Sequence, residues 1–373
     1  MSLAGALSHG WRIDDAALDG RNNFHLIRLF AALLVLFAHS FHLLQRAGDE
    51  PFGSWFIWLD ASLIGVSIFF FVSGFLVARS WDRRGNLAGF LAARALRIAP
   101  ALWLVLAVTV LGLGAIVTTL PAADYFHTAQ TKKYLVLNAI LYTQYLLPGV
   151  FESNPVPGIN GSLWTIPLEV VLYLILAVCG FIGLLEPDAT ARTVARRIAL
   201  RPLLSGALIL LGTLLVSKVL RTGAQYYTLA GYFLLGTLCY RYRHRLSLRL
   251  DLTLGLAIVA IAAGRTLFGP IVMPLAIASV TLAVALHPAF GMRPTWFHRH
   301  DYSYGAYLYG FPVQQALIVA GLSVPLALFG CAVIVTLLCA AVSWHAIERP
   351  ALHRKAQVEH AIATRFSRRY RRG

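Results

Sequence analysis

Two ionisable side chains share one face of the first long apolar segment. Arg28 and His39 are eleven positions apart. At about 100° per residue this is three turns plus about 20°, so in a helix both point the same way, about 16 Å apart along the axis. Histidine accepts a proton from a hydroxyl group near neutral pH, as O-acylation requires of a general base. An equally open interpretation makes Arg28 a boundary anchor and His39 or His42 an interfacial residue.

Two other groups of residues place charge in apolar segments. Arg94 and Arg97 are three positions apart, hence neighbours on one helix face, and two guanidinium groups there suit a phosphorylated ligand. Taken alone, this pair fits a cytoplasmic anchor better. Glu169 lies roughly two turns inside an apolar segment, where a short carboxylate cannot reach water. It must be paired or protonated, which favours a functional role.

A pair of small residues interrupts the bulky second segment. Ser73 and Gly74 follow three consecutive phenylalanines, so a neighbouring helix or a ligand could approach the backbone closely there. Taken alone, the pair is typical of close helix packing.

The hydrophobic composition of the chain indicates that these apolar segments lie in a membrane. Of 373 residues, 58% are hydrophobic and 13% charged, against roughly 45–50% and about 25% in soluble domains. The apolar residues form runs of about 17 to 25, the length of a membrane-spanning helix. We therefore expect an all-α, polytopic integral membrane protein with about ten transmembrane helices. The expected spans are residues 24–44, 56–78, 98–120, 163–185, 203–220, 227–240, 252–265, 270–286, 304–319 and 324–345.

The net charge of +16 sets the orientation of these spans. Lys and Arg gather in short loops and at the chain ends, which places both termini in the cytoplasm and argues against a nucleic-acid partner. We expect a cytoplasmic segment at 1–23, one transmembrane domain at 24–348 and a basic cytoplasmic tail at 349–373. An outer stretch at 121–160 holds a helix expected at 134–147, too short to span. The four cysteines show no CxxC spacing, so no metal site is expected.

Six segments occur in the order seen in the membrane acyltransferase 3 family, which the chain resembles over nearly its whole length. They are Arg28-x10-His39, FFFVSGFLVAR, RALRIAP, NGSLWTIPLEVVLY, SYGAYLYGFPV and IERP. The resemblance implies a multi-pass protein of the cell inner (plasma) membrane that moves an acyl group, usually acetyl from acetyl-CoA, to an extracytoplasmic or lipid-linked glycan. Membrane lipids are its further partners. Some members carry an SGNH-type domain after the last helix, and we expect none here.

The resemblance also implies roles for individual residues. It makes His39 the catalytic histidine with Arg28 as its partner, and it adds Glu169, the acidic residue of the Ser-Leu-Trp motif, to the predicted catalytic residues. Residues predicted at the donor site are Arg94, Arg97, Ser73, Trp164 and Tyr173. The family often has a histidine where this chain has Gly310, so the task of that histidine is missing or has moved, with Gln314 as the candidate.

A membrane transporter or flippase for a polysaccharide precursor is the alternative function. Intramembrane Arg, His and Glu also mark substrate and proton pathways. That function predicts inverted repeats and paired broken helices, which the sequence does not show. Acetyl-CoA binding or hydrolysis by the purified protein discriminates between the two.

Overall fold

The computed structural model describes residues 10–13, 18, 22–56, 58–84, 86–184, 206, 223, 225–290 and 300–354. The predicted span at 203–220 and most of the basic tail lie outside these residues. The chain divides into two compact parts. The first part comprises Met1–Leu76, Ser153–Val156 and Gly231–Leu337, and the second comprises Val77–Glu152, Pro157–Ala230 and Leu338–Gly373.

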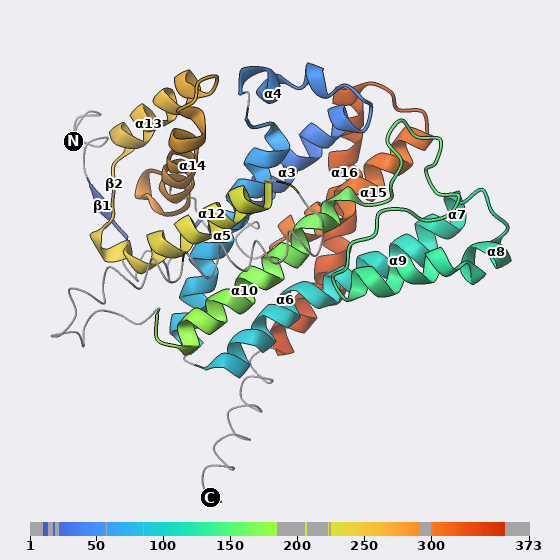
Figure 1. The fold of residues 1–373 in the computed structure, drawn as a ribbon, viewed down its shortest axis with the longest axis horizontal. Coiled ribbons are helices and arrows are strands. Elements are labelled where there is room, and N and C mark those ends of the chain that lie inside the picture. The colour runs from blue at the N-terminus through green and yellow to red at the C-terminus, as the bar shows by residue number, and fades with distance from the viewer. Residues whose placement is uncertain are drawn as a thin grey trace, which may run out of the picture. The chain divides into compact units, whose positions relative to one another are not determined.

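Helices dominate both parts (Figure 1). They are α3 (Phe24–His42), α4 (Pro51–Trp55), α5 (Ala61–Arg84), α6 (Leu87–Ala107), α7 (Ala115–Val117), α8 (Ala122–His127), α9 (Ala129–Ala139), α10 (Thr165–Phe181), α12 (Gln225–Arg241), α13 (Leu250–Ala263), α14 (Gly269–Leu286), α15 (Ser303–Val319) and α16 (Pro325–Ser343). The described strands are β1 (Trp11–Arg12) and β2 (Ser247–Leu248), which pair antiparallel with Trp11 opposite Leu248.

In the first part, α3 packs along α15, and α13 packs along α14 (Figure 1). Helices α5 and α12 approach closely through glycines. A Cβ on Gly74 would collide with the carbonyl oxygen of Phe233, and one on Gly236 would collide with that of Phe71. Thr237 Oγ1 also donates to the carbonyl of Gly74 at 3.3 Å. The predicted packing role of the small residues therefore applies to Gly74.

Two carboxylates cap the first turns of the helices that follow α3. The side chain of Glu50 accepts from the Gly53 amide and caps α4. Asp60 Oδ1 accepts from the Leu63 amide at 2.7 Å at the start of α5. The predicted span at 56–78 thus begins later, at Ala61, because capping side chains satisfy the free amides of a first turn.

In the second part, α6 continues through a π-helical stretch at Val108–Gly114 into α7. It begins at Leu87, earlier than the predicted start at 98, because the Asn86 side chain accepts from the Gly89 amide and caps it. The helix expected at 134–147 was wrong in its bounds. Helix α9 spans Ala129–Ala139 instead, and Leu141 then takes a left-handed φ of 70° that helical residues do not adopt.

Among the described residues, six helical stretches are long and apolar enough to cross a membrane, namely Phe24–His42, Ala61–Arg84, Leu87–Val117, Gly161–Phe181, Gly269–Leu286 and Pro325–Arg354. Helix α13 is apolar but shorter, and α12 and α15 have 17 residues each. Nine of the ten predicted spans thus coincide with helices of the described residues. The all-α membrane class is confirmed, while the ten crossings and the orientation of the termini stay predictions.

Candidate active site

The imidazole of His39 is held by packing rather than by hydrogen bonds. It lies near the end of α3, with the ring of Phe311 edge-on at 5.3 Å between centroids. The ring of His42, one turn further along, is 6.5 Å away. Among the described residues, none hydrogen-bonds to a His39 ring nitrogen. The ring is therefore oriented, while its nitrogens stay available for a substrate.

Gln314 fixes the backbone beside His39. It is fully buried in α15, and its Nε2 donates to the Leu36 carbonyl at 2.8 Å and to Ser40 Oγ at 2.7 Å. Ser40 Oγ in turn donates to the Leu36 carbonyl at 3.0 Å. These bonds fasten the turn of α3 that carries His39 to the α15 turn that carries Phe311.

Gly310 is the position for which the resemblance implied a histidine in related proteins. A Cβ there would lie 2.9 Å from Leu36 Cδ1, so a larger side chain would have to displace the end of Leu36. Gln314, one turn later on α15, supplies the polar contact to α3 instead. Its other oxygen, Oε1, is buried without a partner among the described residues.

Arg28 has a partner that its spacing from His39 does not reveal. Its Nη1 donates to Asp301 Oδ2 at 2.6 Å, and its guanidinium lies 5.8 Å from the centre of the Phe69 ring. Asp301 is 3% exposed and also faces His25 Nδ1 at 3.3 Å. It further accepts from the Ser303 hydroxyl at the start of α15. Arg28 therefore joins α3 to α15 through a buried ion pair, three turns from His39.

The far end of α3 carries a second imidazole with a carboxylate. His42 Nε2 lies 3.3 Å from Asp60 Oδ2, and both side chains are about one-third exposed, at 33% and 29%. Because Asp60 also caps α5, its carboxylate is fixed by the backbone. His42 lies one turn from His39 on α3, whereas Asp60 comes from the start of α5.

A different group of predicted residues gathers in the second part. Arg94 of α6 donates from Nη2 to Ser80 Oγ at 3.3 Å, and its guanidinium lies 5.6 Å from the centre of the Tyr173 ring. Arg84 donates to the same Ser80 hydroxyl. Arg94 Nε is buried with no hydrogen-bond partner among the described residues.

Tyr173 links this cation to the predicted acid. Its hydroxyl donates to Glu169 Oε1, one turn earlier on α10. The structure thus brings Arg94, Tyr173 and Glu169 together, and Glu169 has the hydroxyl partner that its place in an apolar helix requires. Arg97 lies one turn from Arg94 on α6.

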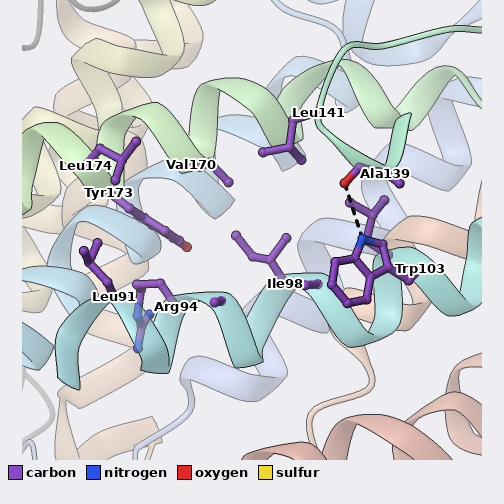
Figure 2. Close-up of a pocket in the computed structure, with 12 residues that line it drawn as sticks. Leu91, Arg94, Ile98, Trp103, Ala139, Leu141, Val170, Tyr173 and Leu174 are labelled. Carbon is purple, nitrogen blue, oxygen red and sulfur yellow. Dashed lines mark hydrogen bonds between the residues drawn. The ribbon is translucent and has the colours of Figure 1, made fainter. Parts of the chain in front are cut away.

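A cavity of about 400 Å³ lies beside this group (Figure 2). One side is lined by Leu91, Arg94, Ile98 and Trp103 of α6, and the other by Val170, Tyr173 and Leu174 of α10. Ala139, the last residue of α9, and Leu141, just after it, close the cavity. Trp103 Nε1 donates to the Ala139 carbonyl at 3.3 Å, which ties that closing turn to α6. The lining is almost wholly apolar apart from Arg94 and Tyr173.

Trp164 and Ser73 are the other residues that were predicted at the donor site, and that role stays a prediction. Trp164 ends a 3₁₀ turn, Gly161–Trp164, where its carbonyl accepts from the Tyr226 hydroxyl at 2.7 Å and its ring tilts against that of Tyr226. Ser73 lies in α5 of the first part, whereas the other donor residues belong to the second. Within the described residues, no three His, Cys, Asp or Glu side chains form a group that could hold a metal ion.

Sequence reasoning missed three residues around His39 and Arg28. They are Asp301, Phe311 and Asp60. Phe311 lies inside the quoted SYGAYLYGFPV segment, and Asp301 stands two residues before it, so that motif held the signal. Asp60 lies inside the predicted span at 56–78, where an Asp followed by an apolar run matches the rule for a helix-capping residue.

Comparison with known proteins assigns the class. A family model for the acyltransferase domain matches residues 21–345. Nodulation protein 10 of Rhizobium leguminosarum bv. viciae is 31% identical over 374 residues, covering 93% of this chain and 96% of that protein. An O-acetyl transferase of Shigella phage Sf6 is 28% identical over 304 residues, covering 80% of this chain and 86% of that protein. No solved structure matches.

Apolar helices of membrane-spanning length and an acyltransferase match define a multi-pass membrane enzyme. The chain belongs to the membrane acyltransferase 3 family. Its activity is that of an O-acetyltransferase.

Proposed function

We propose that this enzyme takes acetyl from acetyl-CoA in the cytoplasm and transfers it to a hydroxyl of an extracytoplasmic or lipid-linked glycan. The membrane is the cell inner (plasma) membrane, and both chain ends face the cytoplasm. The observation that carries the proposal is the His39 imidazole. It is oriented by Phe311 and by the Gln314 bonds to α3, while its nitrogens are free of any described hydrogen-bond partner.

The proposed chemistry is general-base catalysis by His39. The imidazole takes the proton of the acceptor hydroxyl, the oxygen attacks the thioester carbonyl, and the carbon–sulfur bond breaks. The proton then goes to the sulfur, so the products are the O-acetyl ester and free CoA. In a route through an acetyl-enzyme intermediate, the same imidazole attacks the thioester carbonyl, forms the N-acetyl bond and releases CoA. Acetyl-CoA supplied without acceptor separates the two routes, because only that route gives an initial burst of about one CoA per protein.

The proposed donor site is the Arg94 group with its cavity. Guanidinium groups bind phosphate oxygens, and Arg94 and Arg97 lie one turn apart near the start of α6. The neighbouring apolar cavity offers space for the uncharged arm of the donor. Relatives give partial support, since one is named an O-acetyl transferase and the other a nodulation protein.

The test replaces His39 with Ala in the full-length protein. His127 in α8 is an exposed histidine outside both groups, so His127→Ala is the matched control. At equal membrane abundance, His39→Ala should lower glycan O-acetylation by the 10² to 10⁴ of general-base catalysis and leave acetyl-CoA binding unchanged. Near wild-type acetylation by His39→Ala would exclude the mechanism. Failure of the wild-type protein to use acetyl-CoA would exclude the donor.

A further inference from the structure

The segment from Glu50 to Asp60 carries aromatic side chains that the proposed donor site and base do not use. Phe52, Trp55 and Trp58 are 37%, 64% and 51% exposed. The Trp55 side chain has neither a hydrogen bond nor a ring contact with any described residue. Trp58 Nε1 donates to the Thr266 carbonyl at 3.4 Å, which fixes one end of its ring.

Carboxylates stand at both ends of this aromatic segment. A Cβ placed on Gly53 would lie 3.2 Å from Glu50 Oε2 and 3.9 Å from Asp60 Cβ, so the two acidic residues flank Gly53 closely. Glu50 is fully buried, and its Oε1 has no hydrogen-bond partner among the described residues. Glu50 therefore serves α4 as a buried cap, and the carboxylate that a ligand can reach at this segment is that of Asp60, which is 29% exposed.

Asp60 connects the aromatic segment to His39. Its Oδ2 lies 3.3 Å from His42 Nε2, and the His42 and His39 ring centroids are 6.5 Å apart. A ring-shaped ligand held by Asp60 and His42 would therefore present its next hydroxyl to His39. All these residues belong to the first compact part.

The chemistry of this surface fits a sugar. Sugar rings are apolar on their C–H faces and bear hydroxyl groups at their edges, so an aromatic face and a fixed carboxylate recognise them together. We propose that Trp55, Trp58, Asp60 and His42 form the acceptor subsite and bind one sugar ring with adjacent hydroxyl groups. This inference rests on the proposed function, and it locates the acceptor that this function requires.

An aromatic belt at the membrane interface is the competing explanation for exposed tryptophans. Such a belt requires apolar bulk but neither a carboxylate nor an imidazole. Here the same segment also positions Asp60, whose charge is held toward His42. Exposed tryptophans together with a carboxylate and an imidazole, one turn from the proposed general base, favour a glycan over lipid as the ligand of this surface.

Two variants separate the explanations. Trp55→Leu combined with Trp58→Leu keeps apolar bulk and removes the aromatic faces. Phe181→Leu, in an aromatic residue of α10 that is 72% exposed, is the matched control. Asp60→Asn removes the charge and keeps an oxygen at the position that caps the Leu63 amide, so α5 retains its cap.

The experiment measures binding of the cell's surface polysaccharide to the protein in nanodiscs. The polysaccharide is first treated with alkali to remove its O-acetyl groups. The double tryptophan variant and Asp60→Asn should each weaken binding at least tenfold, with acetyl-CoA binding and Phe181→Leu unchanged. Wild-type polysaccharide affinity in both variants would overturn the inference. A different outcome would contradict the proposed function and not this inference, namely that the wild-type protein binds the polysaccharide but transfers no acetyl group to it.

Discussion

The ionisable side chains of Arg28, Glu169 and His39 all lie in apolar helices, but each is stabilised there in a different way. A guanidinium stays charged, so Arg28 needs the buried carboxylate of Asp301. Glu169 accepts from the Tyr173 hydroxyl. An imidazole can be neutral and needs no counter-ion, which is why His39 can be held by an aromatic ring alone. His39 is thus the one of the three whose side-chain nitrogens have no hydrogen-bond partner among the described residues, which suits it to exchange a proton with substrate.

Replacing Arg94 and Arg97 with Gln tests the donor site. Two guanidinium groups facing phosphates should contribute at least tenfold to acetyl-CoA affinity, about 1.4 kcal/mol. Arg243→Gln with Arg245→Gln changes the net charge equally in another basic turn and serves as control. Calorimetric titration of acetyl-CoA measures both. Equal affinities in the two double variants would make Arg94 and Arg97 topology anchors.

Gln314 and Gln315 are adjacent and equally buried, but they hold different elements. Gln314 bonds to α3, whereas Gln315 bonds to Asn154 and to the Val156 carbonyl. Losing such bonds costs about 1–3 kcal/mol where a group is left unsatisfied. We expect Gln314→Leu and Gln315→Leu to lose similar stability, with kcat reduced at least tenfold only in Gln314→Leu.

The kcat values of the two Leu variants are compared from initial rates at saturating acetyl-CoA. Each rate is normalised to the amount of folded protein found by size-exclusion chromatography. Gln314→Asn, which keeps the amide on a shorter side chain, should be intermediate. Equal kcat losses in the two Leu variants would assign Gln314 a purely structural role.

At the scale of elements, α3 and α15 are joined at two levels, by Arg28 with Asp301 and by Gln314 with Leu36 and Ser40. Helical periodicity predicted that Arg28 and His39 share a face of α3. It could not predict Asp301, which is 273 positions from Arg28, because pairing across such a separation depends on tertiary packing. Helix bounds failed where caps decide them, as at Asp60 and Asn86.

The Arg28 and Asp301 pair should behave as a buried ion pair. Arg28→Met alone leaves a carboxylate that is 3% exposed without its cation, which typically costs about 3–5 kcal/mol. Asp301→Asn alone should also destabilise the protein, and the double variant should recover much of the loss because neither charge then remains. Thermal unfolding in detergent measures this cycle. Additive losses in the double variant would show that the two side chains do not interact.

The close contact of α5 with α12 gives a second test of an element. Gly74→Ala would force its new methyl group into the Phe233 carbonyl, so the helices must separate. Gly330→Ala in α16 meets no atom within 4 Å and should be neutral or stabilising by about 0.5–1 kcal/mol. Thermal unfolding should show a lower midpoint for Gly74→Ala alone. Equal midpoints would contradict the contact.

At the scale of the whole molecule, composition predicted the helical membrane class, and the six motifs predicted the family that the comparisons confirm. The resemblance implied one donor site for Arg94 and Tyr173, and the Arg94 guanidinium does lie 5.6 Å from the centre of the Tyr173 ring. It did not predict that Tyr173 also bonds to Glu169, which was expected only as the acidic residue of the Ser-Leu-Trp motif. It could not predict the cavity beside them, because Ala139 and Leu141 reach it only through the turn that ends α9. Membrane orientation depends on the charge pattern alone and needs its own experiment.

Cysteine labelling tests that orientation. In a background with the four native cysteines replaced, single cysteines are placed at exposed Ser54, Lys133 and Leu87. The Lys/Arg clusters place the loops after α3 and after α7 outside, and the turn between α5 and α6 inside. A membrane-impermeant maleimide should therefore label Ser54→Cys and Lys133→Cys in intact cells. It should label Leu87→Cys only after permeabilisation. Labelling of Leu87→Cys in intact cells would invert the orientation and place the Arg94 group on the side away from cytoplasmic acetyl-CoA.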